Sequence, residues 1–343
     1  SSKNNSSGSS SKGYDSNVDY SLAIKNAEKS GASQATIDKL KEERQNKIND
    51  KYSGKDPYKK YDSGYFNQQA ALDIIKLSLD DYIKTVGWYD KKPLAMGVGL
   101  IGRVDPNQGI WLQIDPSRTQ PIALAKELAD IYGIPCHIDN DVKSATRAER
   151  VWGFGQISKN FIYLNIGTGI AVGTVVNGRQ IRGSHFNAGE VGHVRVGVNV
   201  GIKCTCGRVD CVEAIASGIG FDRCARILQK DYTTDLHIPA DKGERIPVSE
   251  IFALSRKGDP LCVKLVENAS EALANLVMNL VRVTDPETIV LGGGVVADGY
   301  IHAKIMELLN PTTMRFVSNG VVITKLNPEF IGLLGAGAVA MNM

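Results

Sequence analysis

The sequence has no apolar run that approaches the roughly 20 residues needed to cross a bilayer. Its N-terminus is rich in Ser, Asn and Lys and has no apolar signal segment. An excess of one charge is also missing, because 40 Lys and Arg face 37 Asp and Glu, which gives a net charge of +3. We therefore expect a cytoplasmic protein with no membrane partner, and the charge alone does not indicate nucleic acid.

Cysteine is scarce as well, and the six that occur are not spaced like a disulfide framework. Three of them cluster in one short stretch, at Cys204, Cys206 and Cys211. The others stand singly, at Cys136, Cys224 and Cys262. Metal binding by the cluster, with the single cysteines as small core residues in a reducing cytoplasm, accounts best for this usage.

The 343 residues, of which 43% are hydrophobic, suffice for a sizeable core and suggest two domains. Residues 1–12 are of low complexity and are expected to be disordered. Residues 13–62 are polar, with stretches compatible with helices over 19–29 and 33–48. Globular character begins near Tyr65.

Beyond Tyr65, stretches with helical and with strand character alternate, which indicates an α/β fold. Helices are predicted over 69–85, 121–132, 142–151, 261–283 and 333–341. Strands are predicted over 94–100, 134–138, 161–166, 170–176, 179–181, 288–291 and 321–324. Asn177-Gly178 is a strong hairpin signal and should join two of these strands.

The strongest chemical constellation is His193 with Cys204, Cys206 and Cys211. Three thiolates and one imidazole supply a complete tetrahedral zinc shell. Because four protein ligands leave no open position, such a zinc ion should be structural rather than catalytic. The alternative is a set of loop cysteines with an unrelated histidine.

The stretch from 164 to 217 resembles the signature region of the ROK family, which comprises bacterial sugar kinases and sugar-sensing regulators. It combines a Gly-Thr-Gly turn, a Gly-Glu-x-Gly-His box, a Cys-x-Cys-Gly loop and a Cys-x-Glu step at the family's spacing. The similarity runs from about Met96 to the C-terminus.

This resemblance implies the actin-like (ribonuclease H-like) two-lobed α/β fold of sugar kinases, with the sugar between the lobes. Residues 63–141 would form the small lobe, joined by a returning C-terminal helix over 332–343. Residues 142–331 would form the large lobe with the zinc loop, and residues 1–62 a separate polar segment. The family's tendency to dimerise also implies a homodimer.

Asn140-Asp141 stands at the end of a predicted strand and just before a helix, where open α/β sheets bind ligands. By the resemblance, Asp141 would be the general base that takes a proton from the sugar hydroxyl, and Asn140 a sugar ligand. The alternative for this pair is a helix N-cap.

Glu190, His193 and Glu213 match the family's sugar-contact positions, and carboxylates and imidazole suit the hydroxyls of a hexose or hexosamine. His193 would then serve both the sugar and the zinc, so that the metal positions the sugar loop. The alternative for Glu213 is an acid in the first turn of a helix.

Two glycine turns resemble the family's nucleotide loops. Gly167-Thr168-Gly169 resembles the second phosphate loop, whose backbone N–H groups cradle phosphate oxygens. Gly292-Gly293-Gly294 resembles the loop on the adenosine side. Plain tight turns are the alternative for both.

Other positions depart from the family's pattern. No Asp-x-Gly-Gly-Thr loop, which grips the ATP phosphates in ROK kinases, occurs before residue 96. We therefore expect an incomplete first lobe that holds Mg-ATP poorly. Smaller departures are Arg103, Asp210 in place of the usual glycine, and 115–117 in place of a segment that contains Asn.

The N-terminal segment fits the spacing of a helix-turn-helix through Ala27, Gly31, Ser33, Ile37 and Leu40. The basic residues that would approach DNA phosphates are Lys39, Lys41 and Arg44. A solvated helical hairpin is the alternative. We therefore expect an ATP-dependent hexose kinase, with a sugar-responsive DNA-binding regulator as the alternative and an inactive sugar-binding protein as a third reading.

Overall fold

The computed structural model describes residues 23, 26, 27, 29–52, 68–86, 92–114, 120–241 and 243–342. The chain divides into two compact units, residues 1–93 and 94–343. The segment 1–12, predicted to be disordered, lies outside the described residues. Among the described helices, none is both long and apolar enough to cross a membrane.

Among its described residues, the first unit has the helices α2 (Gln34–Tyr52) and α3 (Gln68–Val86), which confirm the helices predicted over 33–48 and 69–85. The helix predicted over 19–29 lies largely outside the described residues. Gly31 has a φ of +72°, a left-handed conformation that allows the turn before α2. The Ser33 hydroxyl then accepts a hydrogen bond from the Thr36 N–H at 3.3 Å and caps the helix. A helical turn, Gly31 and α2 thus follow one another as the sequence predicted.

The second unit begins with β1 (Met96–Leu100), which pairs in parallel with β4 (Cys136–Asn140). Between them lie an antiparallel hairpin of β2 (Arg103–Asp105) and β3 (Ile110–Gln113) and the helix α4 (Leu124–Tyr132). Trp111 on β3 is 1% exposed, and its indole N–H donates to the Ile101 carbonyl at 2.9 Å. This buried ring fastens the hairpin to the end of β1.

A five-stranded sheet forms the centre of the second unit, in the order β7-β6-β5-β8-β9. Its strands are β5 (Phe161–Ile166), β6 (Ile170–Val176), β7 (Arg179–Gln180), β8 (Thr288–Gly292) and β9 (Val321–Ile323). β5, β8 and β9 are parallel, whereas β6 pairs antiparallel with both β5 and β7. Asn177 and Gly178 both have positive φ, 51° and 74°, so the predicted hairpin turn is confirmed.

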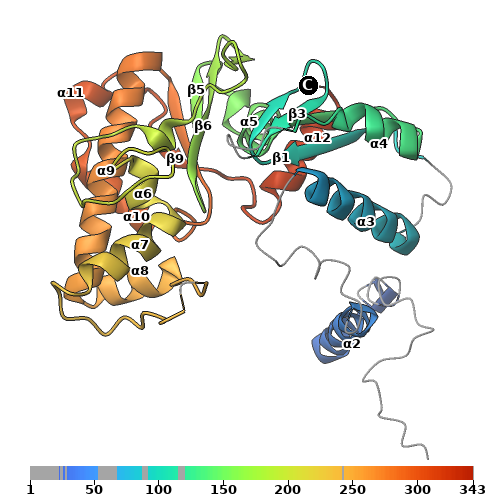
Figure 1. Cartoon of the computed structure of the whole chain (residues 1–343), viewed down its shortest axis with the longest axis horizontal. Coiled ribbons are helices and arrows are strands. Elements are labelled where there is room, and N and C mark those ends of the chain that lie inside the picture. Colours follow the sequence, from blue (N-terminus) through green and yellow to red (C-terminus); the bar gives the residue numbers. More distant parts are fainter. Residues whose placement is uncertain are drawn as a thin grey trace, which may run out of the picture. The chain divides into compact units, whose positions relative to one another are not determined.

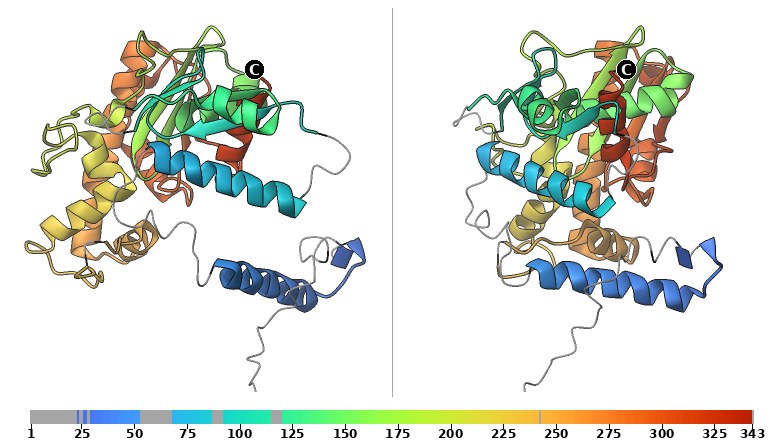
Figure 2. Two further views of the ribbon diagram at one scale, coloured as in Figure 1. Left: turned by 45° about the vertical axis from the view of Figure 1, so that its right-hand side comes forward. Right: turned by 90° about the vertical axis from the view of Figure 1, so that its right-hand side faces the viewer.

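The two faces of β5 pack into different cores because successive side chains point to opposite sides of a sheet. Ile162 and Leu164 belong to a large core with α6, α7, α9 and α10, whereas Phe161 and Tyr163 pack with α5. The sheet therefore lies between two helical layers (Figures 1 and 2). The helices are α5 (Asp141–Trp152), α6 (Val212–Ala216), α7 (Gly218–Leu228), α8 (Val248–Arg256), α9 (Pro260–Thr284), α10 (Tyr300–Leu308), α11 (Pro311–Met314) and α12 (Ile331–Ala340).

Local signals explain where the longest helix begins and ends. The Asp259 carboxylate caps α9 by accepting from the Cys262 N–H at 2.9 Å, and Pro260 occupies the first turn, where its missing N–H costs nothing. Asp285 ends the helix in a left-handed conformation. The elements β2, β3, α6, α7, α8, α10 and α11 were not predicted, although Asn310 and Pro311 supply the same kind of cap signal at the start of α11.

The C-terminal helix α12 packs against α5 and β1 through backbone contacts that glycine permits. A Cβ atom on Gly335 would lie 2.7 Å from the Ser144 carbonyl carbon on α5. A Cβ atom on Gly97 in β1 would lie 1.9 Å from the Ala336 oxygen. The close approach of α12 therefore depends on small residues on both sides.

Gly335→Ala should lower the free energy of unfolding by about 1–3 kcal/mol, because the added methyl group overpacks the contact with α5. Gly332→Ala is the matched control on the same helix, since nothing lies within 4 Å of a Cβ there. This control should leave stability unchanged or raise it by up to about 1 kcal/mol. Denaturant titrations of the two variants measure the difference, and equal midpoints would contradict the packing described.

Candidate functional site

Four side chains that bind metals readily converge beside the five-stranded sheet. The ligand atoms of His193, Cys204, Cys206 and Cys211 all lie within 4.8 Å of one another. The His193 Nδ1 is 3.3 Å from the Cys204 Sγ, and the Cys206 and Cys211 Sγ atoms are 3.6 Å apart. A tetrahedral zinc site requires about 3.8 Å between sulfurs and about 3.5 Å between sulfur and nitrogen. The donor set and spacing therefore fit a closed zinc site.

The loop that carries these cysteines is shaped by Asp210. This residue has a φ of 58°, the left-handed conformation in which glycine is favoured, so the structure explains why glycine is usual at this position. Asp210 is nevertheless useful as an aspartate, because its buried carboxylate accepts the N–H groups of Val200 at 3.2 Å and Ile202 at 2.9 Å. Aspartate in place of glycine thus adds two hydrogen bonds that hold the cysteine loop.

The thiols of the cluster differ in acidity before any cation binds. Hydrogen bonds from the Arg208 backbone and side chain lower the pKa of the Cys206 thiol to about 6. Burial raises the pKa of the Cys211 thiol to about 12. A bound divalent cation would deprotonate both thiols, because a coordinating thiol loses its proton outright.

A cavity of about 820 Å³ opens next to the cluster. It is lined by Gly102, Arg103, Gln113, Ile114, His185, Asn187, Glu190, His193, Thr205 and Cys206. The Arg103 guanidinium donates to the Gln113 side-chain oxygen at 3.0 and 2.6 Å, which orders one wall. Sites for small molecules occupy cavities of about 300–1,000 Å³, so a monosaccharide fits here with room to spare.

Two of the predicted sugar contacts, Glu190 and His193, face this cavity. Glu190 directly precedes the short 3₁₀ helix η3 (Val191–His193), which turns both side chains to the same side of the loop. Burial raises the pKa of the Glu190 carboxyl, and the nearby Lys143 ammonium opposes this shift. A carboxylate and a ring N–H at one wall can accept hydrogen bonds from vicinal hydroxyl groups and donate one to them.

The predicted pair Asn140-Asp141 lies where β4 passes into α5. Asn140 caps the helix by accepting from the Lys143 N–H at 3.1 Å and also donates to the Gly102 carbonyl at 3.0 Å. Asp141 is exposed, but the protein around it raises the pKa of its carboxyl through partial desolvation. Neither residue is among the described residues that line the large cavity, although Gly102, which Asn140 contacts, is.

Glu213 holds two loops together. Its carboxylate accepts the Ile170 N–H at 2.9 Å, directly after the turn of Gly167, Thr168 and Gly169. It lines a smaller cavity of about 160 Å³ with Thr168, Gly169 and Arg223. Thr205 lines both cavities. Glu213 therefore lies between the glycine turn and the His193 loop. It lines the smaller cavity, whereas Glu190 lines the large one.

The two predicted nucleotide turns lie side by side at the carboxyl ends of β5 and β8. The Val295 N–H donates to the Ile166 carbonyl at 3.0 Å, which joins the turn of Gly292, Gly293 and Gly294 to that of 167–169. Gly292 makes room for the Tyr163 ring, and Gly293 has a φ of +93°, whereas Gly294 faces open space. Packing thus explains the first two glycines without a ligand.

Several residues of the site were not predicted from the sequence. Gln113, His185 and Asn187 line the large cavity, and Arg223 lines the small one. Arg103 was noted only as a departure from the family's pattern. Lys143 was not singled out. None of these residues lies in a spacing pattern that would have distinguished it.

Cys211→Ser should abolish metal binding, because it removes one of the four ligands of a closed site. We expect one zinc per chain in the wild type and less than about a tenth of that in the variant, measured by elemental analysis after desalting. Cys136→Ala is the control, since this buried cysteine lies outside the cluster. Equal zinc contents in wild type and Cys211→Ser would contradict the assignment.

The sequence and the fold are similar to those of proteins of known name. A glucokinase of Thermotoga maritima is 29% identical over 252 residues, which cover 71% of this chain and 78% of that protein. A xylose repressor of Caldicellulosiruptor bescii is 26% identical, with 81% of this chain and 71% of the repressor aligned. A ROK-family glucokinase of Streptomyces griseus, solved with glucose and AMPPNP, superposes with a TM-score of 0.64 at 23% identity and covers 81% and 89% of the two chains.

The family itself follows from a direct match. Residues 63–342 match the model of the ROK family, which is well over half of the chain. The α/β fold is that of ROK hexokinases and glucokinases, the actin-like fold of sugar kinases. Kinases and repressors occur side by side among the similar proteins. The chain belongs to the ROK family.

Proposed function

We propose that residues 94–343 bind a hexose or hexosamine in the large cavity. The proposal rests on the cavity of about 820 Å³, which Glu190 and His193 line. This cavity lies directly beside the cluster of His193 and the three cysteines. The Glu190 carboxylate would accept hydrogen bonds from sugar hydroxyls, and the ring N–H that zinc leaves on His193 would donate one. Glu213 would contact the sugar from the smaller cavity, which shares Thr205 with the large one. Similarity to a glucokinase solved with glucose supports this ligand class.

In this proposal, His193 contacts both the zinc ion and the sugar. Its Nδ1 faces the Cys204 sulfur, so this nitrogen would bind zinc and leave Nε2 for a sugar hydroxyl. Zinc would contribute structure rather than chemistry, because all four positions of its shell are filled by protein. The ion would hold η3, and therefore Glu190 and His193, in a fixed relation to the cysteine loop.

The reaction that these residues would support is transfer of the γ-phosphate of Mg-ATP to a sugar hydroxyl. Asp141 would accept the hydroxyl proton while the oxygen attacks the γ-phosphorus and ADP leaves. The raised pKa of the Asp141 carboxyl suits a base, and the turns at 167–169 and 292–294 offer backbone N–H groups to phosphates. The boundary between two lobes would then fall at residues 141 and 142, where β4 meets α5.

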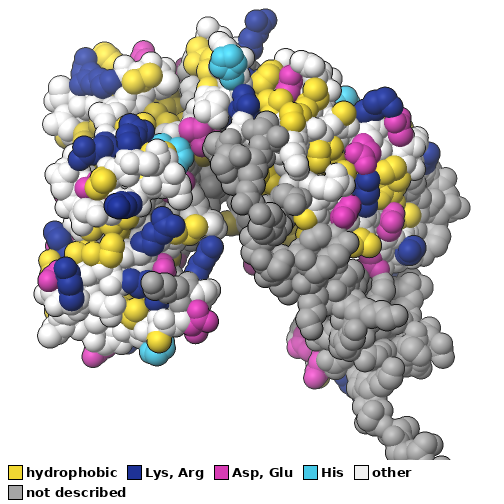
Figure 3. Space-filling model, viewed as in Figure 1, with side chains coloured by type: hydrophobic (Ala, Val, Ile, Leu, Met, Phe, Trp, Pro, Cys, Tyr) yellow, Lys and Arg dark blue, Asp and Glu magenta, His cyan; other side chains and the backbone are white. Residues whose placement is uncertain are grey.

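A sugar-responsive regulator is the second candidate function. Two observations favour it: the repressor among the similar proteins, and the helical turn, Gly31 and α2 in the first unit. The missing Asp-x-Gly-Gly-Thr loop also weakens ATP binding, and positioning of the triphosphate is most of phosphoryl-transfer catalysis. Figure 3 shows Lys and Arg side chains at several places on one face of the second unit. The DNA contacts of such a regulator would come from α2, where Lys39 and Lys41 are exposed.

If the chain is a kinase, ADP release should depend on both ATP and a hexose, and Asp141→Ala should slow it by about 10²–10⁴-fold. A coupled assay over a panel of glucose, mannose and N-acetylated hexosamines measures this rate. Asp130→Ala, at an exposed acid on α4, is the matched control and should leave the rate unchanged.

Loss of turnover in Asp141→Ala with sugar binding retained would support the role of Asp141 as base. Equal rates in Asp141→Ala and the wild type would exclude that role. Sugar binding without any ADP release from the wild type would reject the kinase and leave the regulator or an inactive sugar-binding protein.

If the chain is a regulator, it should bind duplex DNA with an affinity that falls steeply as salt rises. The double variant Lys39→Ala, Lys41→Ala removes two exposed cations from α2 and should reduce the salt slope by about two. Fluorescence anisotropy across a salt series measures both slopes. A slope that the double variant does not change would show that α2 makes no phosphate contacts.

A further inference from the structure

Lys143 is a buried lysine in the first turn of α5, and its ammonium group lies between β6 and the loop that precedes Glu190. Its side chain is 6% exposed, and Nζ donates to the Val172 carbonyl at 2.7 Å and to the Ala188 carbonyl. Val172 lies on β6, and Ala188 lies two residues before Glu190. The amine therefore joins the start of α5 to the segment that carries a predicted sugar contact.

The geometry of β6 explains why a cation is needed at this point. The Val172 N–H donates to the Gly189 carbonyl at 2.9 Å, so residues 188–190 run along the edge of β6 like a short additional strand. The Val172 and Ala188 carbonyls then approach the same position, and two acceptors there require a donor between them. Gly189 must lack a side chain, since a Cβ atom would lie 2.1 Å from the Val172 oxygen and 2.6 Å from Nζ.

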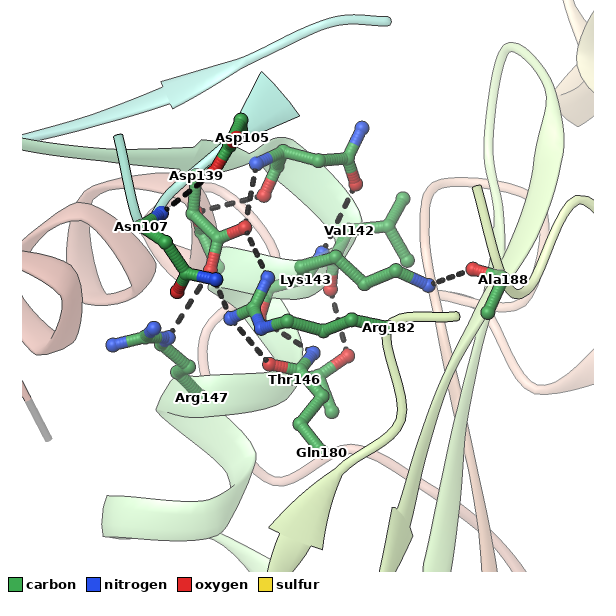
Figure 4. A network of polar contacts seen from close by, with 12 residues as sticks. Asp105, Asn107, Asp139, Val142, Lys143, Thr146, Arg147, Gln180, Arg182 and Ala188 are labelled. Atoms are coloured by element: carbon green, nitrogen blue, oxygen red, sulfur yellow. Dashed lines mark hydrogen bonds and ion pairs between the residues drawn. The ribbon is translucent and has the colours of Figure 1, made fainter. Parts of the chain in front are cut away.

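A second tie anchors the same loop a few residues earlier. The Arg182 guanidinium donates to both carboxylate oxygens of Asp139 on β4, at 2.8 and 2.7 Å, and Arg147 pairs with the same carboxylate at 3.1 Å. Asp139 is 1% exposed, so it depends on these partners. The Gln180 side chain also donates to the Lys143 carbonyl at 3.1 Å. Figure 4 shows these contacts converging on the junction of β4 and α5.

Four charged groups face the Lys143 ammonium from different elements. Glu190 in the loop, Asp139 on β4 and Asp141 at the start of α5 favour the protonated form, and Arg182 opposes it. Burial outweighs them and lowers the pKa of the Lys143 amine to about 8. The charge that bridges the two carbonyls should therefore be present at neutral pH and lost in mildly alkaline solution.

We propose that Lys143 is a positioning residue, which holds the 188–190 segment on the edge of β6 and thereby sets Glu190 relative to Asn140 and Asp141. The inference rests on the proposed function in one respect, namely that Glu190 contacts the sugar. Lys143 is not a catalytic residue, because its ammonium is directed at two backbone carbonyls and it does not line the large cavity among the described residues. Its effect reaches the ligand only through the loop.

The test compares Lys143→Met and Lys143→Arg with the wild type, all as zinc-loaded full chains, by calorimetric titration with glucose and N-acetylglucosamine. Lys143→Met keeps the length of the side chain and removes the charge, and should weaken sugar binding by about 10–100-fold, the usual cost of losing hydrogen bonds to a charged group. Lys126→Met on α4, an exposed lysine, is the control and should bind like the wild type.

A pH series separates positioning from a merely structural role. Wild-type affinity should fall as the pH rises from about 7 to about 9.5, because the amine with a pKa near 8 loses its proton over this range. Lys143→Arg keeps its charge throughout, since arginine does not deprotonate in proteins, so its affinity should stay level. The comparison of the wild type with Lys143→Arg tests the positioning role even if Lys143→Met does not fold. A wild-type affinity that stays level over this pH range would overturn the proposal.

Hydrogen exchange gives a readout that needs no sugar. In Lys143→Met, peptides over 183–193 should exchange about tenfold faster than in the wild type, whereas those over 161–166 in β5 should not change. If no sugar binds the wild type but exchange changes as expected, the proposed function fails and the role of Lys143 in holding the loop stands. If sugar binds and neither exchange nor affinity responds to Lys143→Met, the positioning role fails and the proposed function stands.

Discussion

Three sulfurs and one ring nitrogen lie within 4.8 Å of one another, and the arrangement of the candidate site depends on this convergence. Thiolates held so close repel one another unless a cation lies between them, and a closed tetrahedral ion removes that repulsion. His193 belongs at once to this cluster and to the wall of the large cavity. The cluster thus fixes the position of the His193 ring, and the same ring lines the cavity in which a ligand would bind.

The loop from 182 to 193 is held at both ends, but by different kinds of interaction. At one end Arg182 and Lys143 tie it to β4, β6 and the start of α5 through charged hydrogen bonds. At the other end His193 enters the cysteine cluster. Glu190 lies between these anchors, so the loop leaves its carboxylate little freedom to move. Preorganisation of this kind reduces the ordering cost of binding a small polar ligand.

Local patterns in the sequence predicted much of this molecule and failed where burial depends on distant segments. The strand 161–166, the Asn177-Gly178 turn and the four cluster residues were predicted because period, turn chemistry and thiol spacing are local. Lys143 was missed because its partners Val172 and Ala188 lie 29 and 45 residues away. The helix α6 was missed because its five residues leave little periodicity to detect. The helix α7 was missed although Ser217, which accepts from the Gly220 N–H, is a local cap signal at its start.

A glucokinase and a repressor both occur among the similar proteins, and either proposed function would require the proposed sugar pocket beside the cluster. The most direct measurement is therefore calorimetric titration of glucose and N-acetylglucosamine into the zinc-loaded chain, repeated after chelation and again after zinc is restored. If zinc in the cluster holds the cavity wall, binding should be saturable, disappear with the metal and return with it. Binding of equal affinity with and without zinc would show that the cavity wall does not depend on the cluster.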